Sequence, residues 1–211
     1  MAGRSIQLNL VQGFGLAQRA ARSGVYGLGG KRALDLVLLG LFAPLWMPLL
    51  CLLWLISWLE AGQGLYVDLR VGRDGRVFRC WKIRTMRRDL PRGCAAYKQI
   101  NDPRVTRIGG LLRRSSLDEL PQLLCVLKGE MSLVGPRPIP ASELDHYGTQ
   151  QRRYLALRPG LTGLWQISGR NALPYSERVA LDVRYANKFS TTLDLQILCA
   201  TCREVWRMSG R

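Results

Sequence analysis

The chain has 211 residues and a formal net charge of +16, from 31 Lys and Arg against 15 Asp and Glu. Its single histidine, His146, excludes a multi-histidine zinc site and disfavours a Ser-His-Asp triad. The positive balance points to a polyanion, a phosphorylated substrate or an anionic membrane face as the partner.

Residues 31–60 contain an apolar segment with a predicted break. The 24 residues from Leu36 to Leu59 carry no charge, and a straight helix of that length can cross a hydrocarbon core of about 30 Å. Pro44 and Pro48 lie inside this run, and each removes a backbone donor, so a sharp bend is expected. Residues 1–30 precede it, and their glycine-rich, weakly amphipathic sequence leaves a surface-bound or a loosely ordered segment open.

The charges that flank the apolar run are basic on both sides. Lys31 and Arg32 come before it, and several arginines follow it from Arg70 onward. Basic flanks belong on the cytoplasmic side, so two of them favour a segment that enters and leaves by the same face. Charge alone keeps a kinked single-pass helix as an equal alternative. Asp35 is expected either to pair with a neighbouring cation or to remain solvated at the boundary.

The remainder, residues 61–211, is predicted to form a small α+β domain. Alternation over residues 65–71 and 77–83, joined by a turn at Asp74-Gly75, predicts a β-hairpin. Residues 87–110 are expected to be a polar loop. A helix is expected to begin near Ser116, which forms an S-x-x-E capping box with Glu119. Helical patterns return at about 141–156, 174–189 and 193–208.

The last predicted helix has an apolar face at 3.6-residue spacing, formed by Leu195, Leu198, Cys199, Cys202, Val205 and Trp206. Arg203, Arg207 and Arg211 flank that face, as in a helix that lies on an anionic membrane surface. A core helix with basic, solvated edges is an equal alternative for its first half.

The adjacent acids Asp118 and Glu119 are unusual in so basic a chain, and Arg113 and Arg114 stand just before them. One interpretation is structural, since both acids suit a helix start. The functional interpretation is that the carboxylates hold Mg²⁺ against substrate phosphates or attack phosphorus. The domain's arginine-bearing loops, stiffened by Gly and Pro, are suited to phosphate binding.

Several motifs occur together in a characteristic order. They are Lys31-Arg32-x-x-Asp35 before the apolar run, then "KIRTM", "SLDELPQL", "LKGEMSLVGPRP", "RPGLTGLWQISGRN" and "ERVALDVRY". As a set they resemble the bacterial monotopic phosphoglycosyl transferases, from about Lys31 to the C-terminus. Without room for four additional membrane helices, the chain resembles the compact form, close to the undecaprenyl phosphate N,N'-diacetylbacillosamine 1-phosphate transferase type.

The resemblance implies a transferase (EC 2.7.8 class) that moves a sugar 1-phosphate from a UDP-sugar to a polyprenyl phosphate and releases UMP. It implies a covalent phospho-sugar intermediate on Asp118, and Mg²⁺ held by Glu119 with Asp118. It also implies phosphate and nucleotide contacts from the residues that match the family motifs, namely Lys82, Arg84, Thr85, Arg113, Pro136, Arg137, Pro138 and Arg170.

The resemblance further implies a re-entrant membrane helix broken at a Ser-Pro pair, with the catalytic domain on the cytoplasmic face of the bacterial inner membrane. Here Ala43 precedes Pro44, so the hydroxyl that helps to satisfy the freed backbone is missing, and Pro48 is expected to share the break. The lipid bilayer is an expected partner, and a homodimer and downstream glycosyltransferases are further candidates.

Two alternatives compete with this interpretation. A membrane-tethered nucleic-acid-binding domain explains the charge, but it gives Asp118-Glu119 no role, and no aromatic stacking platform or binding-helix motif is present, so nucleic acid is not expected as a partner. A non-catalytic membrane scaffold would tolerate Asp118→Asn. The sequence does not identify the sugar.

Overall fold

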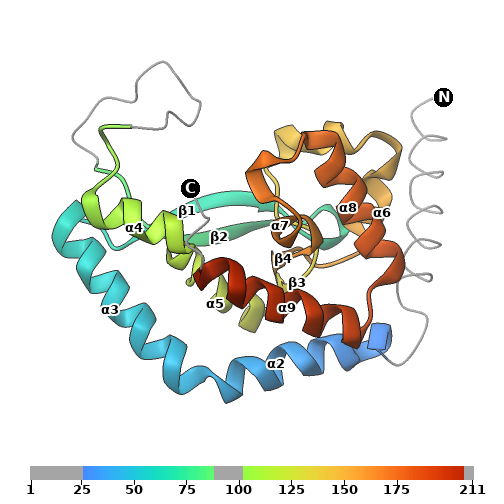
Figure 1. Ribbon diagram of the computed structural model, residues 1–211, viewed down its shortest axis with the longest axis horizontal. Helices are drawn as coiled ribbons and strands as arrows, with labels where there is room; N and C mark the ends of the chain where they lie inside the picture. The colour runs from blue at the N-terminus through green and yellow to red at the C-terminus, as the bar shows by residue number, and fades with distance from the viewer. Residues whose placement is uncertain (1–25, 88–101, 207–211) are drawn as a thin grey trace.

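The computed structural model describes residues 26–87 and 102–206. Most of the predicted N-terminal segment 1–30 lies outside the described residues, as do Cys94, Arg207 and Arg211. Within them the fold is α+β, as predicted: helices surround two small two-stranded sheets (Figure 1).

The apolar segment forms two helices, α2 (Lys31–Leu41) and α3 (Ala43–Ala61), that meet in a wide V at Phe42 (Figure 1). The break lies next to Pro44, which occupies the first turn of α3, where its missing N–H costs least. Pro48 lies inside α3, which continues through it. Among the described helices, only α3 is both long and apolar enough to cross a membrane, and few of its residues are buried.

The N-terminal half of this V is fastened to the rest of the protein through polar contacts of α2. Arg32 donates from its two terminal nitrogens to the carbonyls of Val126 and Leu127, at 2.5 and 2.9 Å, near the end of α5 (Gln122–Lys128). Asp35 is buried and accepts hydrogen bonds from Ser132 Oγ and Leu133 N–H at 3.1 and 2.9 Å. Asp35 is thus buried, so the solvated alternative is wrong, and it forms no salt bridge with any residue in the described part of the chain.

The predicted hairpin is present as β1 (Leu65–Val71) and β2 (Val77–Ile83), which pair antiparallel in a register that sets Val71 opposite Val77. The turn η2 (Arg73–Gly75) places Asp74 and Gly75 at φ 61° and 77°, a conformation that Gly and Asp adopt most readily. One face of the hairpin carries Asp68, Arg70 and Lys82, and all three line the same groove.

The region around the acidic pair departs from the prediction. Helix α4 (Arg107–Ser115) occupies part of the expected loop, and Thr106 caps it by accepting from Gly109 N–H at 2.9 Å. Ser116 is left-handed at φ 59° and ends α4, and its side chain makes no capping hydrogen bond. The capping box is therefore wrong: Glu119 closes the short 3₁₀ turn η3 (Leu117–Glu119), and the next helix, α5, starts at Gln122.

The C-terminal half surrounds a parallel strand pair and is mainly helical. Strand β3 (Ser132–Val134) pairs with β4 (Gly160–Thr162), which lies in the motif RPGLTGLWQISGRN. Between them lie a 3₁₀ segment, η4 (Ala141–Gln150), and α6 (Gln151–Leu155). Short α7 (Leu164–Ile167) and the turn η5 (Arg170–Ala172) precede α8 (Tyr175–Lys188) and α9 (Thr191–Trp206), which match the two C-terminal helices predicted.

The main core joins α2, α5, β3 and α9. Its most buried members include Cys125, Met131, Tyr185 and Ile197, which have essentially no exposed surface. Helix α9 turns Asp194 and Ile197 toward this core, whereas Leu195, Cys199, Cys202 and Trp206 are exposed. Of the apolar face that the sequence predicted, Leu198 packs against the core, whereas Leu195, Cys199, Cys202 and Trp206 remain exposed.

Candidate active site

The acidic pair lies at the centre of an open groove of about 2400 Å³. Turn η3, between α4 and α5, carries Asp118 and Glu119 against strand β2. The left-handed Ser116 reverses the chain just before the pair, so the two acids lie between helices and not in the first turn of one. Both line the groove with Lys82, Arg113 and Arg137.

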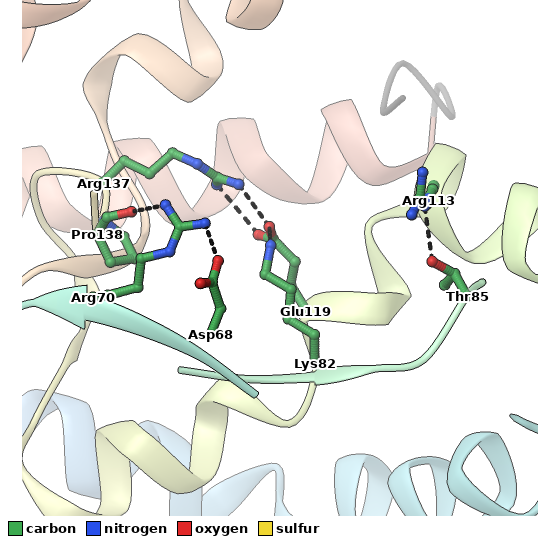
Figure 2. Close-up of polar contacts among 8 residues, drawn as sticks. All are labelled: Asp68, Arg70, Lys82, Thr85, Arg113, Glu119, Arg137 and Pro138. Atoms are coloured by element: carbon green, nitrogen blue, oxygen red, sulfur yellow. Dashed lines mark hydrogen bonds and ion pairs between the residues drawn. The ribbon is translucent and has the colours of Figure 1, made fainter. Parts of the chain in front are cut away.

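Glu119 is held by two cations from different parts of the chain (Figure 2). Lys82 Nζ donates to its Oε1 at 2.8 Å, and Arg137 donates from Nη2 to Oε1 at 2.7 Å and from Nη1 to Oε2 at 3.3 Å. Burial alone would raise the pKa of the Glu119 carboxyl, but the two cations outweigh it and hold that pKa well below its usual range. Glu119 is therefore ionised throughout the physiological range.

Asp118 is in a different state from its neighbour. Its carboxylate accepts no hydrogen bond from any residue in the described part of the chain. Burial, with the adjacent negative charge of Glu119, raises the pKa of Asp118 to about 6, against the opposing charges of Lys82, Arg113 and Arg137. The pair thus combines one neutralised carboxylate with one that is poorly solvated and free to act on a ligand.

Two more of the predicted residues form a contact on the α4 side of the groove. Arg113 Nε donates to Thr85 Oγ1 at 2.8 Å, and Thr85 O accepts from Thr106 N–H at 3.1 Å, which ties strand β2 to the start of α4. This contact orients the Arg113 guanidinium, which lies apart from the Glu119 cluster (Figure 2) but whose charge still acts on Asp118. Thr85 is buried and acts here as an acceptor that orients Arg113.

Two other predicted arginines line the same groove but make different contacts. Arg84 lies over the ring of Tyr66 at 5.6 Å. Arg170 has a left-handed backbone, at φ 52°, and its Nε donates to the carbonyl of Gln166 at 3.1 Å. The charges of Lys82, Arg113 and Arg137 therefore act on Asp118, whereas Arg84 and Arg170 line the same groove through other contacts.

The loop that carries Arg137 is held at every backbone carbonyl from Pro136 to Ile139. The donors are Gly160 N–H to Pro136 O at 2.8 Å, Tyr154 OH to Arg137 O at 2.9 Å, Arg70 Nη1 to Pro138 O at 3.3 Å, and Val71 N–H to Ile139 O at 2.9 Å. Arg70 is in turn paired with Asp68 (Figure 2). A loop fixed at four successive carbonyls presents its arginine without reorganisation when a ligand arrives.

Sequence analysis missed Arg70 and Tyr154 in this role. Arg70 carried a weak signal, because Asp68 and Arg70 give the hairpin a polar face at a period of two residues. The sequence around Tyr154 gave no such indication, because its hydroxyl reaches the loop only through the packing of α6 behind it. The neighbouring ring of Tyr147 is held by a hydrogen bond of 2.7 Å that its hydroxyl donates to Asp182.

The arrangement suits chemistry on phosphate. Three cations converge on the acidic pair, and an arginine fork and a lysine are the side chains that neutralise phosphate oxygens. A desolvated carboxylate beside them can attack phosphorus, because the cations offset the charge that builds up on the incoming and leaving oxygens.

Comparison with known proteins gives consistent relatives. A profile described as bacterial sugar transferase matches residues 26–208. The chain is 40% identical over 195 residues to the undecaprenyl-phosphate galactose phosphotransferase of Salmonella typhimurium, covering 85% of this chain and 41% of that protein. It is 42% identical over 201 residues to the exopolysaccharide production protein ExoY of Sinorhizobium fredii, covering 87% and 89% of the two chains.

A third relative is the UDP-glucose:undecaprenyl-phosphate glucose-1-phosphate transferase of Caulobacter vibrioides, 43% identical over 182 residues, or 81% of this chain and 67% of that protein. The aligned part of the chain thus spans about two-fifths of the Salmonella protein but most of the ExoY protein.

Proposed function

The chain belongs to the bacterial sugar transferase family, and we propose that it transfers a sugar 1-phosphate from a UDP-sugar to a polyprenyl phosphate. The observation that carries the proposal is the unequal acidic pair, in which Glu119 is neutralised by Lys82 and Arg137 and Asp118 is left without a hydrogen bond among the described residues. The activities named for the relatives support the sugar, the uridine nucleotide and the lipid carrier. The site and the family match both favour this activity over nucleic-acid binding.

Asp118 is the nucleophile in this proposal. One of its carboxylate oxygens attacks the phosphorus that bears the sugar, the bond from that phosphorus to the bridging oxygen breaks, and UMP leaves with the bonding electrons. In the second step a phosphate oxygen of the polyprenyl phosphate attacks the same phosphorus and returns Asp118 as a carboxylate. No proton has to move in either displacement, so the site needs charge compensation more than an acid or base.

Glu119 is a poor candidate for the nucleophile for a physical reason. Its two oxygens accept hydrogen bonds from Lys82 and Arg137, at 2.8 Å and at 2.7 and 3.3 Å, which withdraws the electron pairs that would attack phosphorus. The same contacts set Lys82 and Arg137 side by side, and each retains donors for substrate phosphate. Arg113, oriented by Thr85, supplies the third cation.

The acidic pair also fits Mg²⁺. Asp118 and Glu119 provide adjacent oxygen donors, and the described residues contain no larger cluster of metal-binding side chains. This donor set matches the way Mg²⁺ is commonly held, by one or two carboxylates together with substrate phosphates. When bound, the ion would neutralise oxygens of the pyrophosphate.

We place the reaction on the cytoplasmic face of the inner membrane. The V of α2 and α3 would enter the bilayer and return to the same side, since the two helices meet at Phe42 within the apolar run and basic residues flank that run on both sides. This position would bring the groove to the depth of a lipid phosphate.

The test of the function is the covalent intermediate. Purified protein incubated with a panel of UDP-sugars and Mg²⁺, but without polyprenyl phosphate, should release about one UMP per active site and gain the mass of a sugar phosphate on the peptide that contains Asp118. Asp118→Asn should do neither. An adduct on another residue, or UMP release by the Asn variant, would show that the assignment of the nucleophile is wrong.

A further inference from the structure

Helix α9 exposes an uncharged stripe that its packing into the core does not explain. Leu195, Cys199 and Cys202 are exposed within one arc of the helix, beside the face that buries Asp194 and Ile197; Val205 in the same arc is half-buried, and Leu198 packs partly against the core. Leu195 is 43% exposed and both cysteines are exposed as free thiols. All five line the same groove as the acidic pair.

The wall across the groove is also apolar, and it is formed at the break between α2 and α3. Leu38, Phe42 and Trp46 line the groove there, and Phe42 is 51% exposed. Helix α9 lies in the opening of the V formed by these two helices (Figure 1). One continuous groove therefore has an apolar part between α9 and the helix break and a cationic part around Arg113 and Arg137.

We propose that the part of the groove between α9 and the α2–α3 break holds the isoprenoid chain of the acceptor lipid. The inference rests on the proposed function and adds the location of the acceptor's tail. A polyprenyl phosphate has one anionic group on a long apolar chain, and the groove offers cations that continue into an uncharged passage. Bulk phospholipid, whose phosphate is blocked by a headgroup, is the competing occupant.

The thiols of α9 provide a direct test. Protein in nanodiscs of neutral phospholipid is treated with a maleimide, and the labelling rate of each cysteine is followed by peptide mass spectrometry, with and without undecaprenyl phosphate. At a ligand concentration about ten times Kd, about one-tenth of the protein stays free, so Cys199 and Cys202 should label about tenfold more slowly. A cysteine introduced at Val77, which is 59% exposed on β2 and outside the groove lining, is the internal control and should be unchanged.

Phosphatidic acid at the same concentration separates the acceptor from a generic anionic lipid. It should not slow labelling of Cys199 and Cys202. Equal protection by both lipids would overturn the proposal, as would unaltered labelling of the two α9 cysteines in the presence of undecaprenyl phosphate. Equal slowing at the cysteine introduced at position 77 would overturn it too, because the effect would then not be specific to the groove.

A matched pair of variants tests the same groove through kinetics. Cys199→Trp narrows the groove, whereas Cys51→Trp adds the same bulk at another exposed helical position. We expect Cys199→Trp to raise the KM for undecaprenyl phosphate about tenfold and to leave the release of UMP in the first half-reaction unchanged. Cys51→Trp should change neither, and a KM that does not move in Cys199→Trp would overturn the proposal.

The two hypotheses fail in different ways. If no UDP-sugar yields UMP, the proposed function is wrong, whatever the labelling shows. If UMP is released and the α9 thiols are not protected, only the location of the isoprenoid chain is wrong.

Discussion

The ionisation of Asp118 should control the rate of the first half-reaction. Only the carboxylate form can attack phosphorus, and burial, together with the charge of Glu119, raises the pKa of Asp118 to about 6. The rate of UMP release should therefore rise with pH and level off above about pH 7. The direction follows from the raised pKa: below it the nucleophile is protonated, and above it the nucleophile is charged.

The size of the rate change between pH 5 and pH 7 follows from the raised pKa of Asp118. With a pKa of about 6, about one-tenth of Asp118 is ionised at pH 5 and about nine-tenths at pH 7, so the rate should increase about ninefold. With the usual value of 3.8, Asp118 would already be more than about nine-tenths ionised at pH 5 and the rate would hardly change. The two cases are easily distinguished.

The assay is single-turnover UMP release with UDP-sugar and Mg²⁺ both held well below saturation, so that the rate reports the pKa of the free enzyme, and the reaction is quenched at intervals between pH 5 and 8. Polyprenyl phosphate is left out, because a phosphate monoester has its own pKa near 6 and would mask the enzyme group. The two phosphates of a UDP-sugar are both esterified and do not titrate in this range. A rate that is flat between pH 5 and 7 would refute the reasoning.

Two variants identify the titrating group. Glu119→Gln removes the negative neighbour, so the midpoint should move to lower pH, although the rate falls. Asp182 is the competing candidate, since burial raises its pKa to about 7, and it hydrogen-bonds to Tyr147 behind the Arg137 loop. Asp182→Asn should leave the midpoint near 6. If the pH dependence disappears in Asp182→Asn, the titration belongs to that residue.

The remaining predictions concern stability, the metal and the membrane segment. Asp118→Asn should raise the free energy of unfolding by about 3 kcal/mol above pH 6, because the native state there holds a poorly solvated charge. This gain should vanish below about pH 4, where Asp118 is protonated in both states. Chemical denaturation at the two pH values measures it, and equal gains at both would contradict the prediction. Glu119→Gln should lower the rate by orders of magnitude and weaken its Mg²⁺ dependence; an active, merely less stable variant would make Glu119 structural. Replacing Pro44 and Pro48 with Leu should produce a spanning helix, so that a cysteine engineered near residue 25, in a background without native cysteines, is labelled from outside only in the variant. Labelling of the parent protein at that position would contradict the re-entrant topology.

Local pattern predicted those parts of the fold that depend on local interactions. The hairpin follows from alternation and a Gly-containing turn, and α8 and α9 follow from helical periodicity. The break follows from proline chemistry, although Phe42 and Pro44 mark it while Pro48 is accommodated inside α3. Helix α4 was missed because its capping Thr106 is followed by Gly109 and Gly110, which are poor helix formers.

Features that depend on contacts distant in sequence were not predictable from pattern. The parallel pairing of β3 with β4 joins segments of three residues each, too short for a period to be recognised. The chemistry of the acidic pair could be inferred from the sequence, but the difference in environment between Asp118 and Glu119 could not. It arises because Lys82 and Arg137 contact Glu119 from positions 37 residues before it and 18 residues after it. Tyr154 and Arg70 donate hydrogen bonds to backbone carbonyls of the Arg137 loop. Every residue has such a carbonyl, so the sequence of the loop gives no indication of these contacts.

The break between α2 and α3 leaves backbone carbonyls at the end of α2 without their usual helical donors. Pro44 has no N–H to donate to the carbonyl of Gly40, and hydrocarbon offers no water to replace such a donor. The position before Pro44 is Ala43, so no hydroxyl is available there. Two other donors act at the bend: Phe42 N–H reaches Leu38 O at 3.1 Å, and the indole Nε1–H of Trp46 reaches Leu39 O at 3.0 Å. Because the indole comes from the first turns of α3 itself, the donor that stabilises the end of α2 is present only when α3 has folded back against it. The bend and the packing of the two helices are therefore one structural unit, which explains how a chain without a hydroxyl at position 43 keeps a break at this proline.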